Sequence, residues 1–215
     1  MKKLFKLLAF LKNPIVPAIV GNVTMLLVRI GYSRDLFYGF LLWNLFLAAI
    51  PLLLSNLIIK TDLRLGVRFL FLLVLWLLFL PNAPYIITDL KHLVYRPPVP
   101  FWFDMLLVLI TAFNGLILGF ISLKQIEWIL DKKHLTRYKE IFRILIVVVM
   151  SYGVYLGRYL RFNSWDVFIS PKTIVIESFQ AIDKETFAYV ICYSFVIYVL
   201  YKFFYVMLPV ANKFA

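Results

Sequence analysis

Apolar residues fill long stretches of the chain, and short polar segments separate these stretches. Six apolar stretches with aromatic or charged flanks occupy residues 14–31, 36–59, 69–88, 101–124, 141–160 and 186–208. Each is close to the roughly 20 residues that an α-helix needs to cross a bilayer core. The pattern therefore predicts an all-α integral membrane bundle of six transmembrane helices.

The composition agrees with this pattern and argues against a separate soluble domain. Hydrophobic residues make up 63% of the 215 residues, and the mean hydropathy is +0.90. Soluble domains contain only about 45–50% apolar residues. We therefore expect a single transmembrane domain over residues 1–215. The first residues, MKKLFKLLAFLK, lack a small-residue cleavage site, so residues 1–13 are expected to form a retained amphipathic cytoplasmic segment.

The distribution of basic residues predicts the orientation of the helices. The N-terminus, the segments 60–68 and 124–143, and the C-terminus together hold 15 of the 23 Lys and Arg residues. Because Lys and Arg collect on the cytoplasmic side, both termini are predicted to be cytoplasmic. The net charge of +12 follows from the same rule, because basic residues on the cytoplasmic side also contact anionic lipid. We therefore expect no nucleic-acid partner.

The third apolar stretch ends in a segment that is unfavourable for a helix inside a membrane. PNAPYIITDLKH, residues 81–92, begins within the outer leaflet when depth is counted at 1.5 Å per residue. Pro81 and Pro84 each remove a backbone donor, so we expect the helix to kink or unwind around Asn82. Carbonyl groups freed at that depth must be buried in protein or line a wet cavity.

Ionisable residues from three spans are predicted to reach the same outer layer. Tyr85, Asp89 and His92 recur at a spacing that places them on one face if the helix resumes. Asp104 lies at the start of the fourth span, where a helix cap is an alternative role. Arg158 follows Arg143 by about 22 Å of helix, and intramembrane charges of this kind usually face the bundle interior in pairs.

These residues predict a polar pocket that opens outward. Its candidate substrate-binding residues are Asn82, Tyr85, Arg158, Arg161, Asn163 and Trp165. Its candidates for a metal site or for ion pairs are Asp89, His92, Asp104 and Asp166. The rest of the membrane core offers only neutral polar residues such as Asn44.

Two further patterns concern packing and the last outer loop. Gly115 with Gly119, and Gly153 with Gly157, have the four-residue spacing that lets helix backbones approach closely. We expect spans four and five to pack through these faces, within the chain or in a homo-oligomer. Pro171 favours the start of a short in-plane outer helix, which could be a lid over the pocket or a plain connector.

Two motifs, LWLLFLPNAPYIITDLKHL and SYGVYLGRYLRFNSWD, make the chain resemble the bacterial membrane family catalogued as domain of unknown function 1361. The resemblance extends from roughly residue 25 to residue 205. It implies a multi-spanning protein of the bacterial cytoplasmic (inner) membrane and assigns no roles to residues. The matching positions are Pro81, Asn82, Pro84, Tyr85, Thr88, Asp89, Leu90, Gly157, Arg158, Arg161, Asn163, Trp165 and Asp166.

Three functional interpretations stay open, and whether the protein is an enzyme is open with them. In the first, the pocket binds or processes an anionic lipid-linked or envelope substrate, with a divalent metal held by the D-x-x-H pair and nearby acids. In the second, the charges hold helices together in a noncatalytic scaffold or accessory subunit of an envelope complex, with a membrane-protein partner. In the third, the protein is a transporter or channel, although the inner half of the spans lacks ionisable residues and no repeat is evident.

Overall fold

The computed structural model describes residues 15–61 and 66–207, and every regular element in these ranges is helical. The long helices are α2 (Ile15–Ser33), α3 (Phe40–Lys60), α4 (Val67–Phe79), α6 (Phe101–Lys132), α7 (Lys139–Tyr159) and α10 (Lys184–Met207). The short ones are α5 (Asn82–Tyr85), α8 (Asp166–Ile169) and α9 (Pro171–Gln180), with 3₁₀ turns η1 (Phe37–Gly39), η2 (Ile86–His92) and η3 (Thr136–Tyr138). The predicted segment 1–13 lies outside the described residues.

Six helical stretches are long and apolar enough to cross a membrane, which confirms the predicted all-α, six-span class. They are Ile15–Ser33, Phe37–Lys60, Val67–His92, Phe101–Lys132, Thr136–Tyr159 and Lys184–Met207. The short helix expected after Ser170 is α9. The protein is therefore a multi-pass membrane protein whose exposed apolar surface requires a lipid bilayer.

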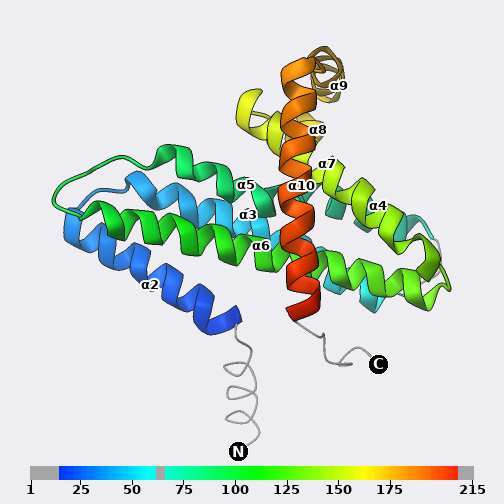
Figure 1. Ribbon diagram of the computed structural model, residues 1–215, viewed down its shortest axis with the longest axis horizontal. Helices are drawn as coiled ribbons and strands as arrows, with labels where there is room; N and C mark the ends of the chain where they lie inside the picture. Colours follow the sequence, from blue (N-terminus) through cyan, green and yellow to red (C-terminus); the bar gives the residue numbers. More distant parts are fainter. Residues whose placement is uncertain (1–14, 62–65, 208–215) are drawn as a thin grey trace, which may run out of the picture.

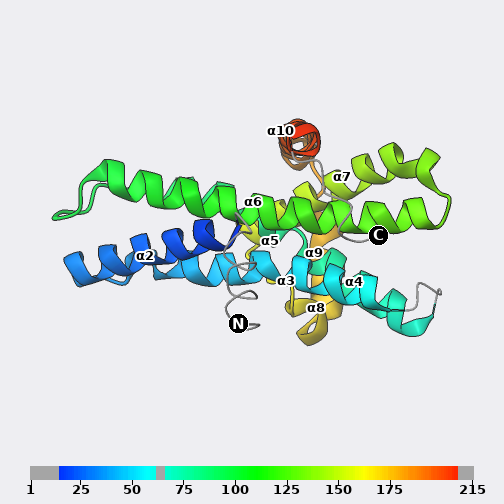
Figure 2. The ribbon, with the colours of Figure 1, turned by 90° about the horizontal axis from the view of Figure 1, so that it is seen from below.

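Helix α6 is the centre of the bundle. Helices α2, α3 and α6 run side by side along the long axis, and α10 crosses this direction steeply while packing on α7 (Figures 1 and 2). In the most apolar 18-residue stretch of α6, 61% of the residues are buried. The corresponding share is 17% for α2 and for α10. The helices that pack around α6 therefore determine where the interior polar groups meet.

Buried polar side chains of α6 connect it to four other helices. The bonds run from Asn22 Nδ2 to Thr111 Oγ1 (2.9 Å), Trp76 Nε1 to Ser122 Oγ (2.5 Å), Ser55 Oγ to Gln125 Oε1 (2.6 Å) and Arg143 Nε to Glu127 Oε1 (2.8 Å). Because an unsatisfied polar group inside a membrane is costly, these bonds favour one arrangement of α2, α3, α4 and α7 around α6.

The helix of the fourth span is longer than the predicted apolar stretch. Helix α6 continues past residue 124 to Lys132, which places Glu127 on the buried face of the helix. Glu127 pairs with Arg143, so the extension adds a buried ion pair beyond the predicted end of the span. The basic residues of 124–143 were expected to lie in a loop. Arg143 is instead buried in α7, where its pairing with Glu127 offsets the cost of burying both charges.

The third span breaks where its prolines predict. Helix α4 ends at Phe79, a turn at Leu80 and Pro81 follows, and α5 then continues into the tighter helix η2. The break is compact, because the Ala83 N–H donates to the Leu80 carbonyl at 3.2 Å and the Tyr85 N–H donates to the Pro81 carbonyl at 3.1 Å.

The two glycine pairs do not pack against each other as predicted; both pack against the broken segment. The pairs are Gly115 with Gly119 on α6, and Gly153 with Gly157 on α7. A Cβ atom on Gly119 would collide with Ala83 Cβ, and one on Gly153 would collide with the ring of Pro81. The four-residue spacing thus marks close backbone approach, but the partner of both helices is the segment from Pro81 to Ile86.

Candidate functional site

Arg158, in the last turn of α7, makes the central ion pair of the site with Asp89 of η2. Arg158 Nη2 lies 2.6 Å from Asp89 Oδ1, and the Asp89 residue is only 1% exposed. Arg158 Nε donates to Thr88 Oγ1 at 2.7 Å, Nη1 lies 3.0 Å from His92 Nε2, and the guanidinium lies 4.4 Å from the centre of the Tyr85 ring. Every guanidinium nitrogen is therefore engaged by the broken third span.

A third helix completes the cluster. Asn44 of α3 donates from Nδ2 to Asp89 Oδ2 at 2.7 Å, so both oxygens of the buried carboxylate accept hydrogen bonds. Because a guanidinium can only donate, His92 Nε2 must accept, which places the proton of a neutral His92 on Nδ1. The cluster joins α3, η2 and α7 and supports one wall of a neighbouring cavity.

The cavity has a volume of about 320 Å³ and lies where α3, the third-span break and α7 meet the segment 162–174. Its apolar wall includes Leu47, Leu77, Val149 and Leu156. Its polar lining comprises the side chains of Asn44, Asn82, Tyr85, Tyr152, Asn163, Ser164 and Trp165. None of the residues that line this cavity is charged, so the ion pair lies behind its wall rather than inside it.

The family model described as "Protein of unknown function (DUF1361)" matches residues 43–200. The chain belongs to the DUF1361 family. The matched region contains the helix break, Arg158, Asp89 and every residue that lines the cavity. No curated protein and no solved structure matches the chain.

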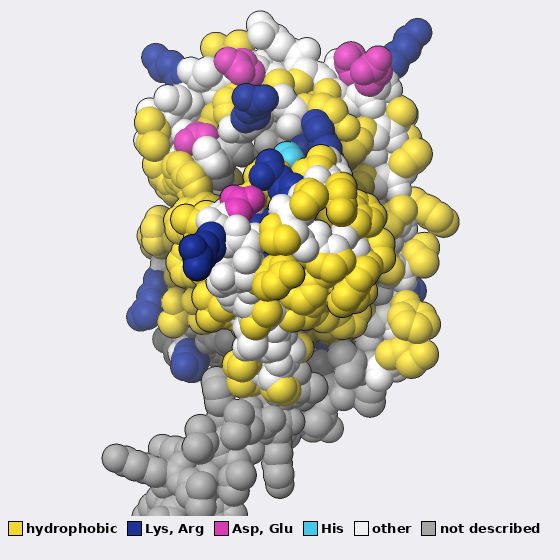
Figure 3. Space-filling model, turned by 90° about the vertical axis from the view of Figure 1, so that its left-hand side faces the viewer, with side chains coloured by type: hydrophobic (Ala, Val, Ile, Leu, Met, Phe, Trp, Pro, Cys, Tyr) yellow, Lys and Arg dark blue, Asp and Glu magenta, His cyan; other side chains and the backbone are white. Residues whose placement is uncertain are grey.

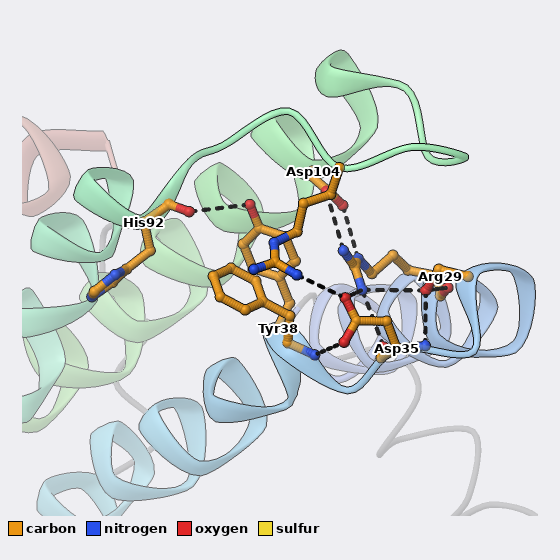
Figure 4. Close-up of polar contacts among 8 residues, drawn as sticks. Arg29, Asp35, Tyr38, His92 and Asp104 are labelled. Carbon is orange, nitrogen blue, oxygen red and sulfur yellow. Dashed lines mark hydrogen bonds and ion pairs between the residues drawn. The ribbon is translucent and has the colours of Figure 1, made fainter.

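Asp104 of this DUF1361 protein lies in a different cluster from Arg158, although both were predicted to be among the residues of one polar pocket. Arg29 of α2 donates from Nε to Asp104 Oδ1 at 3.0 Å and from Nη2 to Asp104 Oδ2 at 3.4 Å (Figure 4). Both residues are 1% exposed. Counting residues along a helix does not give the direction of a side chain, and the side chain of Asp104 faces α2.

Tyr38 and Asp35 complete this second cluster at the end of the molecule where α6 begins. The Arg29 guanidinium lies 4.6 Å from the centre of the Tyr38 ring, and the Tyr38 hydroxyl donates to the His92 carbonyl at 3.3 Å (Figure 4). Asp35 accepts the Phe37 N–H at 2.9 Å, which holds the pKa of Asp35 below its usual value. Basic, acidic and histidine side chains gather on this end of the molecule among hydrophobic ones (Figure 3).

Three other predicted residues lie near the cavity without joining the ion pair. Asp166 Oδ2 accepts from the Asn163 backbone at 2.7 Å and from Asn163 Nδ2 at 3.1 Å, so Asp166 closes the turn before α8. Trp165 makes an edge contact with Trp43, their ring centres 6.1 Å apart. Arg161 is exposed, has a backbone φ of 61°, and does not line the cavity.

The four residues predicted as metal or ion-pair candidates do not come together in one group. Within residues 15–61 and 66–207, no three His, Cys, Asp or Glu side chains are grouped so as to hold a metal ion. Asp89 pairs with Arg158, Asp104 pairs with Arg29, and Asp166 accepts from Asn163. Each carboxylate therefore has a partner of its own, which is an arginine for Asp89 and for Asp104 and an asparagine for Asp166.

The predicted site residues did not include Asn44, Tyr152 and Ser164, which line the cavity. Ser164 Oγ accepts a hydrogen bond from Asn82 Nδ2 at 2.9 Å, and the Tyr152 hydroxyl donates to the Ser178 carbonyl of α9. Asn44 could have been found from the sequence, because an amide side chain inside an apolar span needs a hydrogen-bond partner. The contribution of Tyr152 depends on how α9 folds back over α7, which no local pattern indicates.

Proposed function

We propose that this DUF1361 protein is a binding protein of the bacterial cytoplasmic membrane that holds a lipid-linked or envelope amphiphile in the cavity beside the third-span break. The observation that supports the proposal is a cavity lining that combines apolar side chains with uncharged polar ones. Small-molecule sites usually have this character, with a few placed polar groups in a mainly apolar pocket.

The position of the cavity favours a ligand that is partly in the bilayer. Two lining residues on transmembrane helices are exposed, Trp43 of α3 by 53% and Val149 of α7 by 42%, and such surfaces face lipid. The polar residues Asn163 and Ser164 come from the connection after α7. The Lys and Arg distribution supports an outward opening for this connection. A ligand with an apolar chain and a polar head would contact both regions.

The geometry gives Arg158 a supporting role rather than direct contact with an anionic substrate. Its nitrogens already contact Thr88, His92 and Asp89. The guanidinium also lies against the ring of Tyr85, which lines the cavity, whereas Arg158 does not. Removing those contacts to bind an anion would leave Asp89 buried and unpaired, at a cost of several kcal/mol. Arg158 therefore fixes the position of the third-span segment that carries Tyr85.

We propose binding rather than a reaction because the hydroxyl and imidazole groups of the site are not arranged as a nucleophile and base. Ser164 Oγ contacts the Asn82 amide, and the accepting nitrogen of His92 contacts Arg158. A nucleophilic hydroxyl needs a base within hydrogen-bonding distance. Neither contact supplies one to Ser164.

Filling the cavity is expected to remove the bound amphiphile. Leu156→Trp places an indole where the ligand's apolar part would lie, so amphiphile recovered from protein in phospholipid nanodiscs should fall by about tenfold or more, the factor that 1.4 kcal/mol gives. Quantitative mass spectrometry of the purified protein measures it. Leu145→Trp is the matched control, because Leu145 is on the same helix and 59% exposed.

Two outcomes would count against this proposal. Equal recovery from both variants, with circular dichroism showing unchanged folding, would mean that the cavity holds no amphiphile. Loss of a partner protein without loss of any amphiphile would instead favour the noncatalytic scaffold.

A further inference from the structure

The three asparagines that line the cavity all use their amide donors inside the protein. Asn44 Nδ2 donates to Asp89 Oδ2 (2.7 Å), Asn82 Nδ2 to the Phe79 carbonyl (2.8 Å) and Asn163 Nδ2 to Asp166 Oδ2 (3.1 Å). A carbonyl and an ionised carboxylate can only accept, so these partners fix which end of each amide is nitrogen. The three amide oxygens are therefore left for a ligand, together with the second N–H group of Asn44 and of Asn163.

Those oxygens make the cavity a place for hydrogen-bond donors. Within the described ranges of the chain, no protein donor contacts Oδ1 of Asn44, Asn82 or Asn163. A phosphate or carboxylate brings only further acceptors, which the three carbonyl oxygens would repel. An acceptor that loses water without gaining a donor costs about 1–3 kcal/mol. An anionic head group would therefore leave the three amide oxygens without a donor.

The same cavity also offers donors, which distinguishes a hydroxyl-bearing ligand from an amine. Ser164 Oγ accepts from Asn82, so its own proton is available, and two further lining residues, Tyr85 and Trp165, each carry a donor group. An ammonium group has no lone pair for them, and Asp89, behind the cavity lining, already accepts from Arg158 and Asn44. A hydroxyl both donates and accepts, so several hydroxyls satisfy both sets.

The size and the rings of the cavity suit a sugar. A volume of about 320 Å³ corresponds to roughly ten waters at about 30 Å³ each, which accommodates one hexose ring and the start of a chain. Trp43, Phe162 and Trp165 contribute aromatic surface on which the C–H face of a sugar ring can pack. Resting on the proposed function, we infer that the amphiphile carries an uncharged, hydroxyl-rich glycosyl head group.

Two probes with the same alkyl chain test the head group. Octyl β-glucoside and octyl phosphate are titrated, below their micellar concentrations, into the full-length protein in phospholipid nanodiscs, with tryptophan fluorescence as the signal. The glucoside is expected to bind at least about tenfold more tightly than the phosphate. Tyr85→Phe keeps the ring over Arg158 but removes a hydroxyl, and is expected to weaken glucoside binding by about tenfold.

The outcomes separate the inference from the proposed function. Tyr159→Phe is the matched control, because Tyr159 is 57% exposed and outside the cavity lining, and it should leave glucoside binding unchanged. Equal or tighter binding of octyl phosphate would overturn the glycosyl head group while leaving an amphiphile site in place. Binding of neither probe would overturn both.

Discussion

Replacing Gly153 by leucine is expected to prevent α7 from packing on the third-span break and to destabilise the protein by about 3 kcal/mol or more. A Cβ atom there would lie 2.8 Å from Pro81 Cβ and closer still to Pro81 Cγ. A proline ring cannot rotate away, so the backbones of α7 and the break must separate. Thermal unfolding and size-exclusion profiles of the purified protein measure the effect.

Gly21→Leu is the matched control for this substitution. A Cβ atom on Gly21 of α2 would meet nothing within 4 Å, so the same change should alter the unfolding temperature little. If Gly21→Leu and Gly153→Leu were equally mild, the close approach of α7 to Pro81 would be wrong.

A compensating pair tests the same packing from the side of α6. Gly119→Ala alone should be destabilising because its methyl group would collide with Ala83 Cβ. Adding Ala83→Gly removes the second methyl and should recover much of the loss, although it introduces a flexible residue into the break. Additive effects of the two changes would contradict the contact.

Breaking the ion pair of Arg158 is the second change with a large expected effect. Arg158→Met leaves Asp89 buried and charged beside Asn44, and breaking a buried pair of this kind costs about 3–5 kcal/mol. The double variant Arg158→Met with Asp89→Leu should be more stable than Arg158→Met alone, because no unpaired charge is left. Chemical unfolding in detergent, followed by tryptophan fluorescence, measures both.

An exposed pair provides the comparison. Arg96 and Asp35 lie 3.2 Å apart with side chains about two-fifths exposed, so Arg96→Met should cost less than about 1 kcal/mol. If Arg158→Met were as mild as Arg96→Met, Arg158 would not be buried against the third span.

The six spans could be predicted because apolar length is a local property of the sequence. The helix break could be predicted as well, since Pro81 and Pro84 act on their own backbone. The glycine pairs show where the prediction stopped. Spacing indicates that Gly119 and Gly153 lie at close contacts, but only the fold shows that the shared partner is the segment from Pro81 to Ile86.

The site could be predicted in part for a related reason. Counting residues along the helices predicted that Asp89, Arg158 and Asp104 lie at a similar depth, and the structure brings Arg158 and Asp89 together. The count does not give the direction in which a side chain points around the helix. Asp104 therefore faces Arg29 on the other side of the bundle interior. The cavity itself depends on side chains from distant segments, which no local pattern contains.

An experimental density map of the protein in lipid nanodiscs tests the central claim most directly, namely that the third-span break forms the wall of a ligand cavity. We expect Pro81 to pack against Gly153, with ligand density between Asn82, Asn163 and the α7 residues of the cavity. A map in which Pro81 contacts lipid, or in which protein side chains fill the cavity completely, would contradict it.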